Sequence, residues 1–253
     1  MIDINNIKYK RIFCFGCSFT NYHKMPTWAD ILKLHFENTS TVVHNEGKPG
    51  VGNYYIFNKI VQTGLRYNFT KDDLILIQWS GVFREDRFKD GQWITPGNIL
   101  TQSVYSTSVV NKWFFDEEGM LMRDCSYIHV IKKMLECDDL NYEMFSMNGI
   151  QAIDQYYEPS IENASLQTFK ENRFIGLTSL YQDTLKKINP SMYDIVLGEN
   201  AGVGEGVRLK GDKHPDYHFL PTQHLLYLEK VFQFKPSDEL RTRVEKITKE
   251  LLP

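Results

Sequence analysis

The sequence has no long hydrophobic run. Its 253 residues contain no stretch of the roughly 18 consecutive apolar residues that a membrane-spanning helix requires. Near the N-terminus, Asp3, Lys8 and Lys10 interrupt the apolar residues, so this segment lacks the hydrophobic core of a secretory signal peptide. We therefore expect a cytoplasmic protein with no membrane partner.

Cysteine is scarce, and neither sign of charge predominates. The four cysteines are expected to be free thiols in a reducing compartment rather than a disulfide framework. Cys14 and Cys17 have the spacing of a redox pair, but Cys14 falls within an apolar strand pattern, which favours two buried small residues. With 29 basic and 32 acidic residues the formal net charge is -3, so the sequence lacks the basic surface typical of nucleic-acid-binding proteins.

Short apolar runs alternate with helical patterns along the chain. The run 73–79 is almost continuously apolar, which is typical of a strand buried on both faces of a sheet. Strands that alternate with helices through short links predict right-handed parallel crossovers. We therefore expect one α/β domain over residues 1–253, a three-layer α/β/α sandwich of flavodoxin-like type around a central parallel five-stranded sheet. The expected strands are 11–15, 41–44, 73–79, 142–146 and 193–197, and the expected helices are 26–36, 52–67, 104–115, 120–136, 173–188, 221–232 and 236–252.

The middle of the chain, at about 81–172, has a looser pattern. We interpret it as an irregular insertion rich in aromatic and charged residues. Aromatic faces suit stacking on sugars or packing in an interface. An ordinary core role is the alternative for the side chains concerned, which are Trp79, Phe83, Trp93, Trp113 and Phe114.

A serine follows the first expected strand. Ser18 stands two residues after Gly16, which permits a tight turn. The carboxyl ends of parallel strands are where α/β folds bind ligands, and free N–H groups near a helix start stabilise developing negative charge. Ser18 is therefore a candidate nucleophile, and the alternative is a helix cap.

The second expected strand leads into a glycine-rich loop. Gly47, Gly50 and Gly52 lie within six residues, together with a proline. Such a loop can bring its backbone close to a ligand, although its spacing fits neither the dinucleotide fingerprint nor the P-loop. A plain turn is the alternative.

Three of the seven histidines gather in the segment 212–224 with two aspartates. A histidine that takes a proton from serine needs a carboxylate to orient it, and this segment supplies both groups. His214, His218 and Asp216 could instead bind a metal, but the neighbouring prolines disfavour a helical histidine pair. A surface cluster without a role is the third interpretation.

Taken together, three motifs resemble those of the SGNH (GDSL-type) hydrolase superfamily. Residues 13–20, with the core Gly-Cys-Ser-Phe-Thr, resemble its first block, which carries the nucleophile. Residues 45–50, Asn-Glu-Gly-Lys-Pro-Gly, resemble its second block, and 216–224 resemble its fifth. The resemblance implies that Ser18 is the nucleophile, His218 the base and Asp216 its orienting acid.

By the same resemblance, the backbone N–H groups of Ser18 and Gly50 hold the oxyanion. The chain departs from the pattern at the acid and base, because Asp216 stands one residue closer to His218 than the usual spacing. Asp212 and His214, followed by proline as in the family, form an alternative pair.

The larger departure concerns the third block. The family carries an oxyanion-donating Asn after strand three, and here Gly81 falls at about that position. Asn53, Ser80 or Arg84 would then supply a donor, or the oxyanion would be held by backbone N–H groups alone. The loss of one donor typically lowers the rate about 10²–10³-fold.

Arg84 stands in a run of four charged residues after strand three. We expect it to point into the site and contact a polyhydroxyl or anionic substrate, with Ser80 beside it. Its planar fork suits this task. The alternative is a surface ion pair with Glu85 or Asp86, worth under about 1 kcal/mol.

We thus expect an esterase that cleaves a small ester, such as an O-acetyl group on a carbohydrate, and needs no metal or organic cofactor. An acyltransferase would use the same site with another acceptor. A non-catalytic glycan- or protein-binding module on a degenerate fold is the main alternative, and a metal-dependent hydrolase is a further one.

Overall fold

Four parallel strands form the central sheet in the computed structural model, which describes residues 4–5, 9–99, 104–113, 116–150, 176, 179–198 and 206–253. The strands lie in the order β2-β1-β3-β6. Each outer neighbour is reached by a crossover through a helix, as the alternating pattern predicts. The bounds are β1 (Arg11–Phe15), β2 (Val42–Asn45), β3 (Asp73–Trp79) and β6 (Asn141–Ser146).

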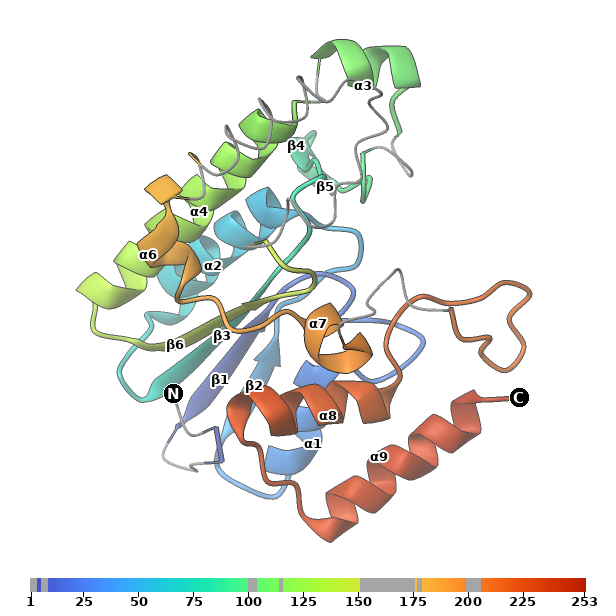
Figure 1. Cartoon of the computed structure of the whole chain (residues 1–253). Coiled ribbons are helices and arrows are strands. Elements are labelled where there is room, and N and C mark those ends of the chain that lie inside the picture. Colours follow the sequence, from blue (N-terminus) through green and yellow to red (C-terminus); the bar gives the residue numbers. More distant parts are fainter. Residues whose placement is uncertain are drawn as a thin grey trace.

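Helices cover both faces of this sheet, which makes the three-layer α/β/α sandwich (Figure 1). One face carries α1 (Trp28–Phe36), α8 (Pro221–Phe232) and α9 (Asp238–Leu251), and the other carries α2 (Asn53–Tyr67) and α4 (Glu117–Cys137). Smaller elements are the β4 (Arg87–Lys89) and β5 (Gln92–Ile94) hairpin, α3 (Thr107–Trp113), α6 (Gln182–Leu185) and α7 (Met192–Leu197). Within the described ranges, no helix has both the length and the apolar character to span a bilayer.

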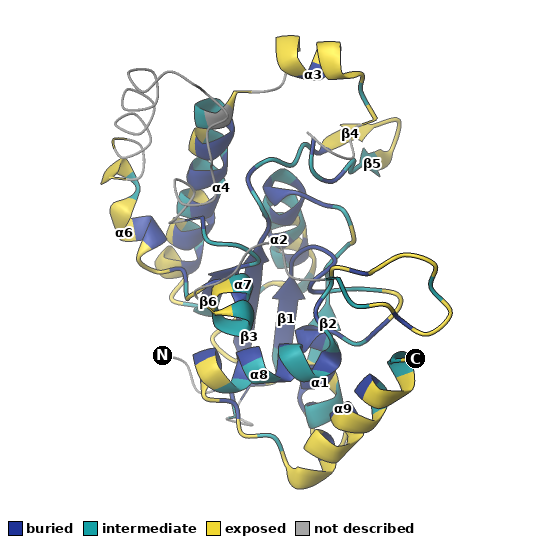
Figure 2. Ribbon diagram, turned by 45° about the vertical axis from the view of Figure 1, so that its right-hand side comes forward, coloured by how far each residue is buried: buried dark blue, intermediate teal, exposed yellow. Residues whose placement is uncertain are grey.

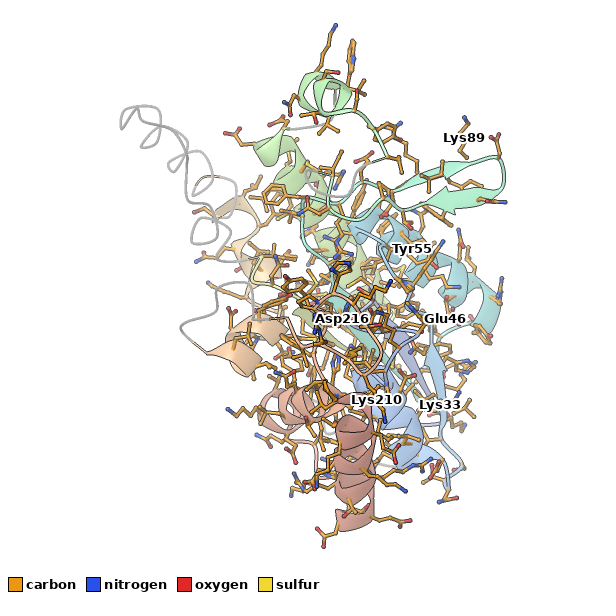
Figure 3. The ribbon with its side chains drawn as sticks, turned by 90° about the vertical axis from the view of Figure 1, so that its right-hand side faces the viewer. Lys33, Glu46, Tyr55, Lys89, Lys210 and Asp216 are labelled. Carbon is orange, nitrogen blue, oxygen red and sulfur yellow. The ribbon has the colours of Figure 1, made fainter. Side chains whose placement is uncertain are left out.

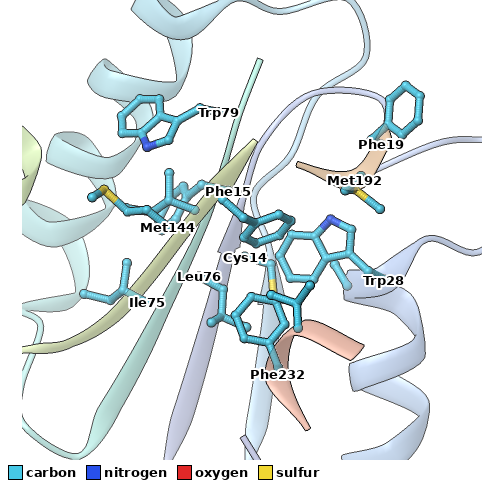
Figure 4. Packing of buried hydrophobic residues seen from close by; sticks show 14 of the residues in the cluster. Cys14, Phe15, Phe19, Trp28, Ile75, Leu76, Trp79, Met144, Met192 and Phe232 are labelled. Carbon is cyan, nitrogen blue, oxygen red and sulfur yellow. The ribbon is translucent and has the colours of Figure 1, made fainter. Parts of the chain in front are cut away.

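The core lies on and around the central strands. Every residue of β3 is buried, in agreement with its almost continuously apolar sequence. Large side chains such as Trp28, Phe145 and Phe232 pack beside the sheet with no more than 1% exposure, each contributing roughly 1.5–3 kcal/mol by burial. Figure 4 shows part of this packing, and Figure 2 shows that exposed residues concentrate on the outer helices.

The register of the two central strands is set by an ion pair at their amino ends. Arg11 pairs with Asp73 across β1 and β3, and its guanidinium donates to both carboxylate oxygens at 2.7 and 2.6 Å. Asp73 is almost fully buried, so the pair is well desolvated. This register places the carboxyl ends of β1 and β3 side by side, where their following loops meet.

The expected fifth strand is wrong, because residues 193–197 lie within helix α7. Ser191 caps this helix, and its hydroxyl accepts the backbone N–H of Asp194 at 3.1 Å. In the described part of the chain the sheet therefore has four strands, and β6 receives only a single parallel bridge from Ile188 on its outer side.

The other expected elements are present, three with the expected bounds (11–15, 73–79 and 221–232) and the rest with shifted ends. The region 83–100 contains the β4–β5 hairpin, and the helices expected at 104–115 and 120–136 are α3 and α4. The expected helix at 173–188 is seen as α6, and its earlier part lies largely outside the described residues. The expectation that residues 1–253 form a single domain stays a prediction.

Candidate active site

Ser18 lies in a tight turn at the carboxyl end of β1. Two backbone hydrogen bonds close the turn, from the N–H groups of Thr20 and Asn21 to the carbonyl of Cys17, at 2.9 and 3.1 Å. Gly16 is required here, because a Cβ at this position would lie 2.0 Å from Thr20 Oγ1. The turn thus holds a serine of 7% exposure at the end of the sheet where α/β folds bind ligands.

The turn is fastened to the neighbouring strand β3. Thr20 Oγ1 donates to Gln78 Oε1 at 2.7 Å, and Gln78 is completely buried. Cys17 Sγ lies 3.9 Å from the same oxygen. Cys14 and Cys17 are both buried free thiols, as expected from their positions. These contacts fix the backbone around Ser18 relative to the sheet.

His218 and Asp216 form the hydrogen-bonded pair that the sequence predicts. His218 Nδ1 lies 2.7 Å from Asp216 Oδ1, and the backbone N–H of His218 donates to the same oxygen at 2.9 Å. An acceptor at Nδ1 fixes the tautomer in which Nδ1 carries the proton and Nε2 is free to accept one.

The environment of this pair favours a neutral imidazole beside an ionised carboxylate. Burial lowers the pKa of His218, and this outweighs the opposing effect of Asp216. Burial alone would raise the pKa of Asp216, but hydrogen bonds from Tyr22 and His218 hold it below its usual value. At neutral pH the pair is therefore a neutral imidazole beside a carboxylate.

Aromatic rings connect His218 with the serine turn. The ring of Tyr22 stacks on His218 at 3.9 Å, and the ring of Phe19, the residue after Ser18, lies 5.0 Å away. In Figure 3, Asp216 lies at about the height of Glu46, which directly follows β2. Among the described residues, however, Ser18 Oγ has no hydrogen-bond partner, His218 included.

The loop 46–52 continues from β2 alongside the serine turn. Lys48 N–H donates to the carbonyl of Gly16 at 3.1 Å, and Asn21 Nδ2 donates to that of Gly47 at 2.9 Å. Gly50 has φ 77°, a conformation that favours glycine. Within the described ranges, the N–H groups of Ser18 and Gly50 meet no acceptor, so both remain available to a ligand.

Asn53 is engaged inside the protein. Its side-chain oxygen accepts the N–H of Ser80 at 2.7 Å, and its amide nitrogen donates to the Ser80 carbonyl at 3.0 Å and to Asp124 Oδ2 at 2.8 Å. The residue is completely buried. This corrects the expectation that Asn53 donates to an oxyanion, because both amide hydrogens are already used.

Ser80 and Arg84 differ in their access to the site. Ser80 is also completely buried, so its hydroxyl does not reach a substrate in this conformation. Arg84 is half-buried, donates to the carbonyl of Val51 at 3.0 Å and contributes to the lowered pKa of His218. Its placement inside the site stays a prediction.

The carboxylates beside Arg84 are occupied by other partners. Glu85 pairs with Arg123 at 2.7 Å and with Arg87 at 3.4 Å. Asp86 accepts the backbone N–H groups of Gly52 and Tyr55, both at 2.9 Å at the closest oxygen, at the start of α2. The alternative of a surface ion pair between Arg84 and either neighbour is therefore not what the structure shows.

The alternative acid–base pair is not assembled. Asp212 pairs with Lys24 at 2.7 Å, and His214 is exposed. His224 lies in α8 with 1% exposure, and burial lowers its pKa to about 3, which makes it a poor proton acceptor. Over the described ranges, no three His, Cys, Asp or Glu side chains form a cluster that could hold a metal ion.

Sequence reasoning did not single out two residues near the ends of these strands and loops, Tyr22 and Asn148. Tyr22 holds Asp216 across 194 residues of sequence, and no local pattern signals such a contact. Asn148 follows β6, where it lies against Gly81. Its only signal is its place just after a predicted strand end.

Comparison with known proteins finds similarity at the level of the fold. No protein-family model matches the chain, and no curated protein matches its sequence. Among solved structures, it is similar to a protein assigned to the G-D-S-L lipolytic family from Desulfitobacterium hafniense DCB-2, with TM-score 0.44, 10% identity, and 93% of this chain and 99% of that chain covered.

Two esterases show comparable similarity. One is EstA from Pseudoalteromonas sp., with TM-score 0.39, 12% identity, and 87% of this chain and 94% of that chain covered. The other is a variant of Axe2, an acetylxylan esterase from Geobacillus stearothermophilus, with TM-score 0.42, 12% identity, and coverage of 89% and 95%. At these identities the similarity concerns the path of the chain and assigns no role to any residue.

Proposed function

We propose that this protein is a serine esterase that cleaves a small ester, with an O-acetyl group on a carbohydrate as the candidate substrate. The observation that carries the proposal is the 2.7 Å hydrogen bond between His218 Nδ1 and Asp216 Oδ1, made beside the turn that carries Ser18. A neutral, oriented imidazole next to a serine is the arrangement that nucleophilic acyl transfer needs.

The reaction uses these groups in sequence. Ser18 Oγ attacks the acyl carbonyl carbon while His218 Nε2 takes its proton, and Asp216 stabilises the imidazolium. The N–H groups of Ser18 and Gly50 hold the oxyanion. When the intermediate collapses, the alcohol leaves with the proton from His218. Water then attacks the acyl-serine with His218 again as base, which releases the acid and restores Ser18.

The hydrogen bond from Ser18 to His218 forms during this cycle rather than beforehand. Catalytic hydrogen bonds are often long in the free enzyme and tighten with substrate bound. A rotation of the serine side chain is the smallest movement that could bring Oγ toward Nε2.

Labelling with a fluorophosphonate probe tests the proposal. The wild-type protein should be covalently captured at Ser18, and Ser18→Ala should show neither capture nor turnover of p-nitrophenyl acetate. The substitution should change the free energy of unfolding by no more than about 1 kcal/mol, since Ser18 makes no side-chain hydrogen bond with the described residues. Wild-type turnover in Ser18→Ala would show the proposal to be wrong.

A second candidate, a non-catalytic glycan-binding module, is favoured by a separate pocket of about 450 Å³. The pocket combines aromatic faces with charged groups, a lining suited to polyhydroxyl ligands. Equal oligosaccharide binding by wild type and Ser18→Ala, with no probe capture in either, would support this function. Its lining includes Tyr54, Tyr105, Tyr127, Glu85, Arg87 and Arg123.

An acyltransferase would use the same acyl-serine chemistry as the esterase, since only the acceptor of the acyl group differs. Product analysis separates the two. Free acid from p-nitrophenyl acetate in water alone indicates hydrolysis, whereas release that depends on an added sugar alcohol indicates transfer.

A further inference from the structure

The ends of β3 and β6 place two residues opposite each other beyond the sheet. Trp79 pairs with Ser146, and the backbone N–H of Met147 donates to the carbonyl of Trp79 at 2.9 Å. Continuing this parallel register by two residues brings Gly81 and Asn148 together. Both follow the carboxyl ends of their strands, on the side of the sheet where Ser18 follows β1.

The carboxamide of Asn148 takes the space that a side chain at position 81 would need. A Cβ built on Gly81 would lie 3.3 Å from Asn148 Oδ1 and 3.5 Å from its Nδ2. The backbone of Gly81 does not have a positive φ, so glycine is not required there for conformation. The missing side chain instead makes room for the amide that reaches across from the neighbouring strand.

This amide has unused hydrogen-bonding capacity. Asn148 Oδ1 is buried without a partner, and within the described ranges its Nδ2 also makes no hydrogen bond. Buried amides are normally paired, so an amide whose nitrogen makes no hydrogen bond with the described residues is suited to donate to a ligand oxygen.

Contacts of the preceding residue tie this amide to the serine turn. Met147 Sδ lies 4.0 Å from the sulfur of Cys17, the residue before Ser18, and 4.0 Å from Arg84 Nη2. The carbonyl of Met147 accepts the backbone N–H of Tyr193 at 3.1 Å, which further fixes this backbone. Asn148 is therefore held by a rigid segment that borders the site.

We propose that Asn148 is a catalytic residue that donates a hydrogen bond from Nδ2 to the oxyanion, as the third donor beside the N–H groups of Ser18 and Gly50. This inference rests on the proposed esterase function. The competing donors are less suited, because the Asn53 amide is fully engaged and Ser80 is completely buried, whereas Asn148 is partly exposed.

Substitution of Asn148 tests this role. In hydrolysis of p-nitrophenyl acetate, Asn148→Ala should lower kcat about 10²–10³-fold with little change in KM, as removal of one oxyanion donor does. Asn148→Asp should lose at least as much, since a carboxylate has no donor and repels the oxyanion. Asn141→Ala is the matched control, because Asn141 opens the same strand at its other end and its amide donates to backbone carbonyls there. It should keep kcat within about twofold.

A second variant, which moves the amide donor to the neighbouring strand, separates loss of the donor from loss of folding. In the double variant Gly81→Asn/Asn148→Ala, the new side chain enters the space that Asn148 has left, and kcat should recover at least tenfold over Asn148→Ala. Gly81→Asn alone should lose activity, because its side chain collides with Asn148.

The outcomes separate the two proposals. Wild-type kcat in Asn148→Ala, or a change confined to KM, overturns the role of Asn148 while probe capture at Ser18 leaves the esterase proposal in place. A wild-type protein that is not captured at Ser18 and hydrolyses no ester overturns both. Full recovery in the double variant, with thermal unfolding midpoints like that of the wild type, supports donation from this position.

Discussion

A hydrogen bond of 2.5 Å joins Tyr22 Oη to Asp216 Oδ2 across 194 residues of sequence. The same tyrosine ring stacks on His218, so one side chain contacts both members of the acid–base pair. Burial raises the pKa of Tyr22, with a further contribution from this hydrogen bond, and the hydroxyl therefore remains a donor. Tyr22 thus connects the serine turn to the segment that carries His218.

Replacement of Tyr22 by Phe should shift the pH profile. The phenyl ring keeps the stacking, but Asp216 loses a donor and exerts a stronger field on His218, which raises the pKa of His218. The acid limb of kcat/KM should therefore move to higher pH, with a loss of up to about tenfold at pH 7. Tyr217→Phe, at an exposed neighbour, should leave the profile unchanged. An unshifted limb in Tyr22→Phe would show that the hydrogen bond does not tune His218.

The histidines of the 212–224 segment should differ sharply in importance. His218→Ala should lower kcat/KM about 10²–10⁴-fold, because it removes the general base, whereas His214→Ala should have little effect. Only neutral imidazole accepts a proton, so the rate should rise with pH and level off above the pKa of His218. Burial lowers this pKa, and the midpoint of the pH profile should therefore fall below the ordinary histidine value of 6.5. Equal losses in the two variants would favour Asp212 and His214 instead.

The serine turn and the acid–base pair could be predicted from sequence because each is local. Ser18 lies two residues from Gly16, and Asp216 lies two residues from His218, so short motifs contain the information. The contact of Tyr22 with Asp216 depends on how distant segments pack. The Asn53 amide cannot reach a ligand because it donates to Asp124, which lies 71 residues away in the sequence.

The sheet also combines features that local sequence predicts with one that it does not. The fold class and four of the strands follow from apolar runs and alternation with helices, and the structure confirms them. The error at 193–197 arose because a short apolar run fits a strand and a helix equally well. Ser191 decides between them by capping α7, and Met192 is buried at its start.

Arg84 should influence both proton transfer and substrate binding. Its positive charge contributes to the lowered pKa of His218, so Arg84→Gln should move the acid limb of kcat/KM to higher pH. If the guanidinium also contacts a polyhydroxyl or anionic group, KM for acetylated oligosaccharides should rise while KM for p-nitrophenyl acetate changes little. Arg66→Gln, at an exposed position on α2 away from the pocket, is the control. A decrease in kcat for both esters would instead indicate an effect on the transition state.

Asp124 should make the fold less stable as the pH rises. It is completely buried, and burial raises its pKa from the ordinary value of 3.8 to about 6 despite the adjacent Arg123. A carboxyl whose pKa is higher in the folded state favours folding when protonated, and this contribution is lost between about pH 4 and pH 6. Asp124→Asn lacks the titration. Its free energy of unfolding relative to wild type should therefore improve by roughly 2.5 kcal/mol from pH 4 to pH 7, measured by urea denaturation at each pH. Asp138→Asn, just beyond the same helix on the surface, should show no such change. A constant difference between Asp124→Asn and wild type at the two pH values would mean that Asp124 is already ionised at pH 4.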